Sequence, residues 1–293
     1  MKDGNAGERA DSSRDPLDRP HHERIQDVAF RRAVDLLDDG DVNGLRDHLR
    51  RHSGLVHQRV VFESGNYFRE PTLLEFVAEN PVRHDRLPPN IVDIARTILD
   101  AGAHANQQAI DMTLGLVCSG RVSRECGVQV PLIELLCDAG ADPNGAMRPA
   151  LVHGEWQAVN ALIRRGARVD LVAAAATGQV QAVRELLPSA GGEQRHLALA
   201  LAAQHGDAEI VALLLDAGED PNRYNPAGAH AHSTPFHQAA LGGHLDVVRT
   251  LVERGARLDI RDLLHDGTPL DWARHASQSH VMEYLQHAAG AAS

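Results

Sequence analysis

Aromatic residues are scarce in this chain, and lysine is almost absent. Phe, Trp and Tyr together make up 3% of the 293 residues, and Lys2 is the only lysine. A core with so few aromatic rings must be filled by Ala, Leu and Val, which suits thin helical layers. Arginine used in place of lysine, with many alanines and glycines, is typical of a GC-rich genome. On this ground we expect a bacterial source.

Positive charge is also in deficit. The 29 Lys and Arg residues stand against 40 Asp and Glu, which gives a net charge of −11 with histidine neutral. This balance argues against a nucleic-acid partner and against an anionic membrane surface. No stretch approaches the roughly 20 apolar residues of a membrane-spanning helix. Residues 1–24 lack the apolar run of a signal peptide, so we expect a disordered N-terminal arm on a cytoplasmic protein.

Catalytic and redox motifs are missing as well. The three cysteines, an odd number without CxxC spacing, are expected to be buried, reduced thiols; they are Cys118, Cys126 and Cys137. The chain has no Gly-x-Ser-x-Gly elbow, no Walker loop, no His-Glu-x-x-His and no dinucleotide fingerprint. The sequence therefore predicts neither an enzyme nor a cofactor.

One pattern does recur near the C-terminus. TPFHQAA begins at Thr234 and TPLDWA begins at Thr268. In each, the threonine can cap the first N–H groups of a helix, and the proline fits the first helical turn. An apolar second helix follows each copy, and Gly255 stands where the first of these should end. A helix pair this short cannot bury its apolar face alone, which predicts further copies stacked beside it.

These residues resemble the ankyrin repeat, whose pattern is Thr-Pro-Leu-His-x-Ala, a Gly-His turn, an apolar second helix and a Gly-Ala-Asp end. The resemblance implies an all-α ankyrin-repeat solenoid over residues 25–289, with 290–293 as a tail. The apolar residues that close successive units give about eight degenerate helix-turn-helix units with short finger loops. After a first pair at 25–49, they are Leu99, Leu136, Ile163, Leu187, Leu215, Val252 and Leu285.

Unit lengths vary, and the insertions are informative because loops carry function. The step from Ile163 to Leu187 is only 24 residues, against a usual period of about 33. Val56 to Glu70 forms a long finger that contains Tyr67 and Phe68. These two rings either pack the loop onto the repeats or anchor a partner. We interpret Asp142-Pro143-Asn144 and Asp220-Pro221-Asn222 as finger turns.

Trp272 occupies the position equivalent to Gln238, which in the ankyrin family faces the concave groove. A large aromatic ring there is a candidate anchor for a partner, although it can equally shield the end of the stack. Tyr224, Leu263 and Leu264 lie on neighbouring fingers, and the apolar Leu263-Leu264 pair resembles a small recognition patch.

Histidine is abundant, with 18 in the chain, and several lie between 230 and 244. The resemblance gives His237 a role inside the Thr-Pro-x-His turn and places His244 in the Gly-His turn. His230 and His232 remain as a binding pair, but two ligands fall short of the three or four that zinc needs. We therefore predict no metal site.

The resemblance implies a non-enzymatic protein–protein interaction module that binds a protein partner through the concave face of the solenoid. Two alternatives stay open at this point. One is a metal-binding or enzyme-associated role for the His-rich finger 230–244. The other is a structural subunit of a homo-oligomer, with possible self-association.

Overall fold

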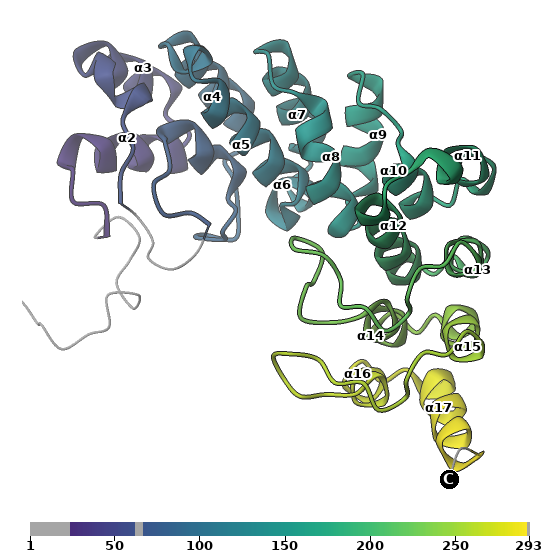
Figure 1. Ribbon diagram of the computed structural model, residues 1–293. Helices are drawn as coiled ribbons and strands as arrows, with labels where there is room; N and C mark the ends of the chain where they lie inside the picture. The colour runs from purple at the N-terminus through teal and green to yellow at the C-terminus, as the bar shows by residue number, and fades with distance from the viewer. Residues whose placement is uncertain (1–23, 62–66, 292–293) are drawn as a thin grey trace, which may run out of the picture. The chain divides into compact units, whose positions relative to one another are not determined.

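Helices and the turns between them make up the computed structural model, which describes residues 24–61 and 67–291 (Figure 1). The chain divides into two compact units, one up to Ala141 and one from Asp142. We describe each by itself and call them unit 1 and unit 2. The expected N-terminal arm, apart from Arg24, lies outside the described residues, and so do the last two residues of the expected tail.

Unit 1 contains three helix pairs. The first pair is α2 and α3, the second is the 3-10 helix η3 with α4, and the third is α5 with α7. The bounds are α2 Val28–Asp38, α3 Val42–Arg51, η2 Ser53–His57, η3 Leu73–Ala78, α4 Ile91–Asp100, η4 Ala103–Ala105, α5 Gln107–Cys118, α6 Arg121–Glu125 and α7 Gln129–Asp138.

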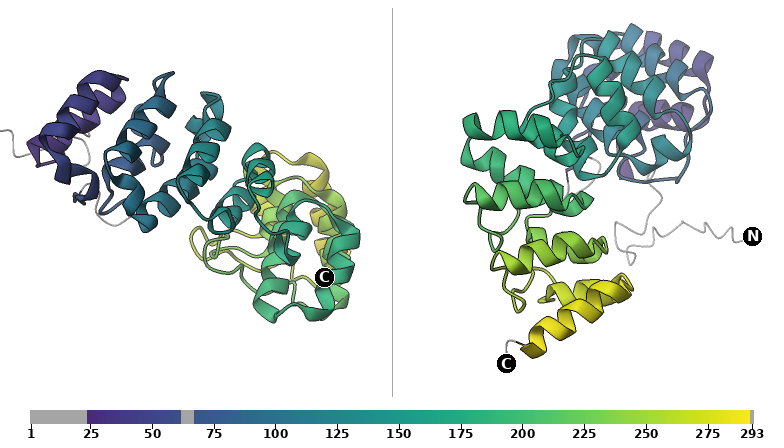
Figure 2. Two further views of the ribbon diagram at one scale, coloured as in Figure 1. Left: turned by 90° about the horizontal axis from the view of Figure 1, so that it is seen from above. Right: turned by 90° about the vertical axis from the view of Figure 1, so that its right-hand side faces the viewer.

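Unit 2 contains five further pairs, which follow one another from α8 and α9 to α16 and α17 (Figure 2). The bounds are α8 Pro143–Val152, α9 Trp156–Arg164, α10 Leu171–Ala176, α11 Val180–Leu186, η5 Leu187–Ser189, α12 Gly192–His205, α13 Ala208–Asp216, α14 Pro235–Leu241, α15 Leu245–Glu253, α16 Pro269–His275 and α17 Ser279–Ala291. The described residues thus hold the eight pairs that the sequence predicts, and the all-helical fold class is confirmed.

Small apolar side chains fill the core of unit 2, as the composition requires. Ala198, Leu199 and Ala202 of α12 are fully buried, and they belong to one cluster with Phe236 and Leu251. The buried positions of α10 and α12, the first helices in the middle of the unit, are mostly alanine and leucine. Successive first helices can approach closely because these side chains are short.

The caps are those that the sequence predicts. His237 Nδ1 accepts hydrogen bonds from the backbone N–H of Thr234 at 3.2 Å and from its hydroxyl at 2.9 Å. Asp271 takes the same place beside Thr268, whose N–H and hydroxyl donate to Oδ2 at 3.0 and 2.7 Å. In unit 1, Glu75 accepts from Thr72 in the same way. Either a carboxylate or an imidazole can therefore close this turn.

The insertion between η3 and α4 is held by buried charges. Arg83, whose side chain is 4% exposed, donates to both carboxylate oxygens of Asp38 at 3.0 Å. It also lies 2.8 Å from Oε2 of Glu79, which is fully buried as a side chain. The guanidinium stands over the ring of Phe76, 5.0 Å from its centroid. This arrangement ties the insertion to α2.

Two expectations from the sequence were wrong. Asp142-Pro143-Asn144 is not a finger turn, because α8 begins at Pro143 with Asp142 as its cap. Aspartate followed by proline suits a helix start as well as a turn, so the dipeptide alone does not distinguish them. The cysteines also differ from expectation. None of the three forms a disulfide, but only Cys118 is buried, and Cys126 is exposed in the turn after α6.

Candidate functional site

Two long loops in unit 2 project side by side, one before α14 and one before α16 (Figure 1). We call residues 223–233 and 257–267 the first and second finger, and these fingers with α14 and α16 the finger surface. The two fingers are joined by a hydrogen bond from the backbone N–H of Leu263 to the carbonyl of His232, at 2.8 Å. Tyr224 adds a second link, because its hydroxyl donates to the carbonyl of Arg261 at 2.6 Å.

Asp262 organises the second finger. Its carboxylate accepts hydrogen bonds from three backbone N–H groups, those of Leu264 at 2.9 Å, His265 at 2.7 Å and Gly267 at 2.9 Å. The indole N–H of Trp272 donates to the same carboxylate at 2.9 Å. Burial alone would raise the pKa of Asp262, but these four hydrogen bonds outweigh it and hold the pKa far below its usual value. The finger is thus fixed through a permanent negative charge.

Trp272 stands where the second finger meets the first helices. Its ring lies edge-on to His237, with centroids 5.2 Å apart, and tilted against His232 at 5.8 Å. A pocket of about 450 Å³ opens beside it, lined also by Leu241, His265 and Asp271. The indole is therefore only half-buried, with one side packed against histidines and the other side at the pocket.

The tip of the second finger is apolar and exposed. Leu263 and Leu264 are 65% and 66% exposed. Both side chains are turned outward because the backbone N–H groups of the tip serve Asp262 and the first finger. The two exposed leucines lie on the finger that Trp272 holds through Asp262, and exposed apolar side chains that cluster in this way often contact other proteins.

The histidines of the first finger do not form a metal centre. His230 and His232 lie edge-to-face, 6.2 Å between centroids. Burial lowers the pKa of His230, and the neighbouring His232 and His153 lower it further, so His230 is neutral at pH 7. Among residues 24–61 and 67–291, no three His, Cys, Asp or Glu side chains converge as metal ligands.

Tyr67 and Phe68, the candidates in unit 1, are placed very differently from each other. Phe68 is 2% exposed and packs edge-to-face on Phe76, with centroids 5.2 Å apart. Tyr67 is 63% exposed, and its hydroxyl donates to Oδ1 of Asn80 at 2.7 Å. The packing alternative thus describes Phe68, whereas Tyr67 is open to contact. Part of this finger, residues 62–66, lies outside the described residues.

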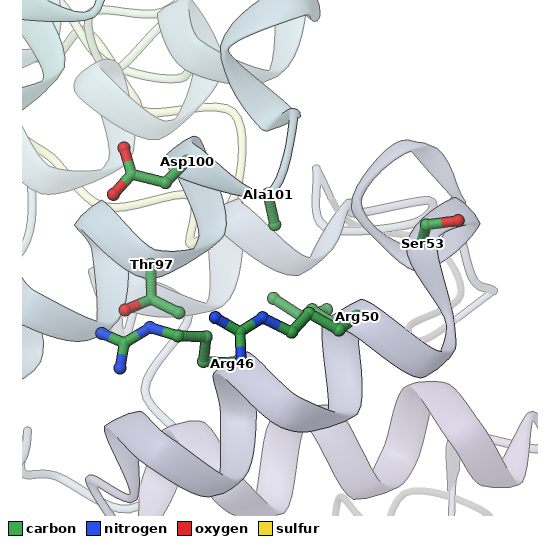
Figure 3. A pocket seen from close by; sticks show the side chains of 7 residues that line it. Arg46, Arg50, Ser53, Thr97, Asp100 and Ala101 are labelled. Carbon is green, nitrogen blue, oxygen red and sulfur yellow. The ribbon is translucent and has the colours of Figure 1, made fainter.

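Unit 1 also has a surface pocket of about 450 Å³ between α3 and α4 (Figure 3). The side chains of Arg46 and Arg50 extend from α3 toward Thr97 of α4, and Asp100 lies at the far side. Both arginines have partners on their own helix, Asn43 at 3.1 Å and Asp47 at 3.1 Å. These contacts explain the two arginines as ordinary surface residues of α3, without a ligand.

A third pocket, again of about 450 Å³, lies in unit 2 beside Trp156 and His205. The sequence analysis did not identify its residues. The sequence did contain one signal, the short step of 24 residues from Ile163 to Leu187, since a short helix pair leaves space between its neighbours.

Among the described residues, no helix is long and apolar enough to cross a membrane.

Comparison with known proteins agrees with the fold. A family model described as ankyrin repeats in three copies matches residues 146–225 and 199–292, which together span half of the chain. Bovine cyclin-dependent kinase 4 inhibitor B is 38% identical over 130 residues, 43% of this chain and 95% of that protein. Human cyclin-dependent kinase inhibitor 2A is 37% identical over 125 residues, 41% of this chain and 77% of that protein.

A third relative is matched over a small part of its own length. The E3 ubiquitin-protein ligase hecd-1 of Caenorhabditis elegans is 34% identical over 168 residues, which is 57% of this chain but 5% of the ligase. These three relatives are eukaryotic, so they give no support to a bacterial source, which stays a prediction. The repeated Thr-Pro caps, the eight helix pairs and the family match agree, and the chain belongs to the ankyrin-repeat family.

Proposed function

We propose that this protein is a non-enzymatic binding module that docks a protein partner on the finger surface of unit 2. The observation that carries the proposal is the pair Leu263 and Leu264, both about two-thirds exposed, on the finger whose Asp262 is hydrogen-bonded to the half-buried Trp272. Clustered apolar and aromatic side chains at a preformed pocket are the usual anchors of protein interfaces. The hydrogen bonds of Asp262 hold the finger in place before binding, which reduces the entropy cost of docking.

We further propose a protein kinase as the partner. This rests on the relatives, because two of them are named as inhibitors of cyclin-dependent kinases and align over most of their own length. In this chain the inhibitor-like function would be steric, since a rigid finger surface can occupy a partner without chemistry of its own. A basic patch on the partner would suit the net charge of −11, mainly by speeding encounter.

The test is a calorimetric titration with purified cyclin-dependent kinase 4. The wild type is compared with a Leu263→Ser, Leu264→Ser variant. The matched control is Val28→Ser in unit 1, which removes an exposed apolar side chain of the same kind, 69% exposed. We expect the double variant to bind at least tenfold more weakly, because two anchor side chains are lost, and the control to bind as the wild type does.

The other outcomes separate the two parts of the proposal. If the kinase binds both variants equally, the docking site lies outside the second finger. If the kinase does not bind at all, the kinase assignment fails, and the finger surface is then tested by affinity capture with the same two variants. Light scattering of the protein alone tests the homo-oligomer alternative, for which the mass would rise with concentration.

A further inference from the structure

The stack of turns in unit 2 is irregular at one place. In the regular part, the turn between the two helices of a pair is hydrogen-bonded to the first helix of the preceding pair. His244 Nε2 donates to the carbonyl of Gln204 at 2.9 Å, and Gln278 Nε2 donates to Leu241 at 3.0 Å. His205 instead donates to the carbonyl of Leu151, at 2.8 Å. It therefore reaches past α10 to α8, which is the first helix of the helix pair two places earlier in unit 2.

The helix that His205 passes, α10, belongs to the shortest step of the repeat, 24 residues from Ile163 to Leu187. The helix has six residues, whereas α12 has 14. Gln204 also crosses the gap, and its side-chain N–H donates to the carbonyl of Val152 at 2.7 Å. The short unit leaves a notch of about 450 Å³ at the helix-to-helix turns, lined by Trp156, Asn160, Thr177, His205 and Asp207. The fingers connect one helix pair to the next, whereas the notch lies at the turns within the pairs. The notch is therefore separate from the finger surface.

Trp156 forms one wall of the notch and is 42% exposed. It is the first residue of α9, and its indole packs edge-to-face on His205, with centroids 4.8 Å apart. The rest of the ring is open to solvent. A tryptophan surface left open in this way is the best aromatic partner for a cation.

The polar groups of the notch include the carboxylate of Asp207, which is a hydrogen-bond acceptor. Asp207 Oδ1 accepts from the N–H of Ile210 at 2.9 Å as the cap of α13. Oδ2 lies on the side of Gly178, where a Cβ atom would stand 3.4 Å away. Asp207 forms no ion pair with any described residue of the chain, and the nearby Arg184 is engaged by Glu209 at 2.8 Å. The carboxylate therefore keeps an uncompensated negative charge at the notch.

His205 adds an acceptor and no charge. Burial lowers its pKa, against the opposing effect of the hydrogen bond to Leu151, so the ring is neutral at pH 7. Since Nε2 faces a carbonyl oxygen, Nε2 carries the proton and Nδ1 presents a lone pair. Among the described residues that line the notch, Asp207 is the only formally charged side chain.

From this combination we infer that the notch binds an arginine side chain of a protein partner. A guanidinium group is planar and can stack on the indole of Trp156. Its several N–H donors can reach Asp207 and the other acceptors at the same time. A lysine ammonium lacks the flat face, and a neutral apolar side chain leaves the carboxylate unpaired. Charge complementarity thus selects a cationic segment, and shape selects arginine within that class.

The experiment uses the full chain and a defined probe. The probe is an acetylated, amidated heptapeptide of glycine and serine with one central arginine. A second peptide carries citrulline at that place, which keeps the shape and removes the charge. The chain has only two tryptophans, so its indole N–H region in a ¹H–¹⁵N spectrum holds two signals. Trp156→Phe assigns them, and Trp272 serves as the internal reference.

We expect the Trp156 signal to shift saturably with the arginine peptide while the Trp272 signal stays in place. Asp207→Asn keeps a good helix cap and removes the charge, so it should weaken binding at least fivefold. The matched control is Asp170→Asn, which makes the same change at the cap of α10, where Asp170 accepts from Ala173 at 3.0 Å. That control should change the affinity less than twofold.

Three results would overturn the inference: an unmoved Trp156 signal, an equal shift with the citrulline peptide, or an equal loss in the two aspartate variants. The first two comparisons measure binding by the wild type alone, with Trp156→Phe used only to assign the signals, so they do not depend on how the aspartate variants fold. The Leu263→Ser, Leu264→Ser variant should bind the peptide normally. Failure at the notch is therefore distinguishable from failure at the finger surface.

Discussion

Units 1 and 2 build the same helix pairs with different side-chain chemistry. Unit 2 closes its turns with histidine and glutamine side chains that donate to backbone carbonyls, as His244 and Gln278 do. Unit 1 secures its insertion with a buried ion cluster, in which Arg83 joins Asp38 and Glu79. The contacts of both units reach the preceding helix pair, but the insertion in unit 1 is held by buried charges, whereas these turns of unit 2 are held by neutral hydrogen bonds.

The difference predicts unequal tolerance to mutation. Loss of a neutral hydrogen bond costs about 1 kcal/mol, because the groups can return to water. Loss of one member of a buried ion cluster costs about 3–5 kcal/mol, because the remaining charges stay buried without compensation. Unit 1 should therefore be the more sensitive unit at its insertion.

The largest effect is expected for Arg83→Met. This change leaves the carboxylates of Asp38 and Glu79 close together without their cation, and it should lower the free energy of unfolding of unit 1 by about 4 kcal/mol. Urea denaturation followed by circular dichroism measures it. Arg50→Met is the control, since the Arg50–Asp47 pair is exposed and should contribute under about 1 kcal/mol. Equal losses in the two variants would refute the special role of the cluster.

Phe68→Ala should come next, with a loss of about 3 kcal/mol, because the buried ring leaves a cavity against Phe76. Tyr67→Ala removes an exposed ring with one hydrogen bond and should cost about 1 kcal/mol or less. Thermal and urea unfolding of both variants separate packing from contact in the finger of unit 1. A large loss for Tyr67→Ala would assign this ring to packing as well.

A smaller effect is expected on how the free energy of unfolding depends on pH. It compares Glu75 in unit 1 with Asp271 in unit 2, which occupy the same position after a threonine cap. Burial raises the pKa of Glu75 above its usual 4.5, despite the hydrogen bonds from Thr72. Hydrogen bonds from Thr268 lower the pKa of Asp271 below 3.8. A raised pKa means that the folded state holds the proton more tightly than the unfolded state. The contribution of Glu75 is therefore greatest below pH 4.5 and falls as pH rises through its folded pKa.

Asp271 should behave in the opposite way. Its contribution is present above pH 3.8 and is lost as the pH falls toward its lowered folded pKa. Unfolding free energies of the wild type, Glu75→Gln and Asp271→Asn between pH 2.5 and 7 check this. The difference between the wild type and Glu75→Gln should fall with rising pH, and the difference for Asp271→Asn should rise. Slopes of the same sign would contradict the comparison.

The smallest effect on stability is expected for the Leu263→Ser, Leu264→Ser variant. Both side chains are about two-thirds exposed, and the backbone of the finger is held by Asp262, so each change should stay within about 0.5 kcal/mol. A melting curve measures this. A drop of several degrees would mean that the leucines pack the finger and are unsuited as anchors.

Much of the fold could be predicted because its signals are local. Thr234 with Pro235, and Thr268 with Pro269, mark helix starts within a few residues, and Gly255, with a φ of 88°, follows the end of α15. The roles of His237 and Thr234 also followed from the pattern. Such features depend on short stretches of chain, and the repeat multiplies the evidence.

Long-range pairs could not be predicted in this way. Arg83 and Asp38 are 45 residues apart, and nothing in either segment names the other. The burial of Phe68 depends on how its loop folds back onto Phe76. The notch depends on the hydrogen bond from His205 to Leu151, two helix pairs earlier. Leu263 and Leu264 were identified as an apolar pair on a finger, and Trp272 by its position in the repeat, but only the structure joined Trp272 to Asp262.

Asp262 has a consequence for how this protein can change over time. The carboxylate fixes the loop through the backbone N–H groups of residues 264, 265 and 267, which any residue except proline supplies. The side chains at 263–265 are thus free to vary while the loop keeps its path. The second finger therefore offers natural selection, or a combinatorial library, a short variable segment on an invariant frame, and new partners can be acquired without remaking the fold.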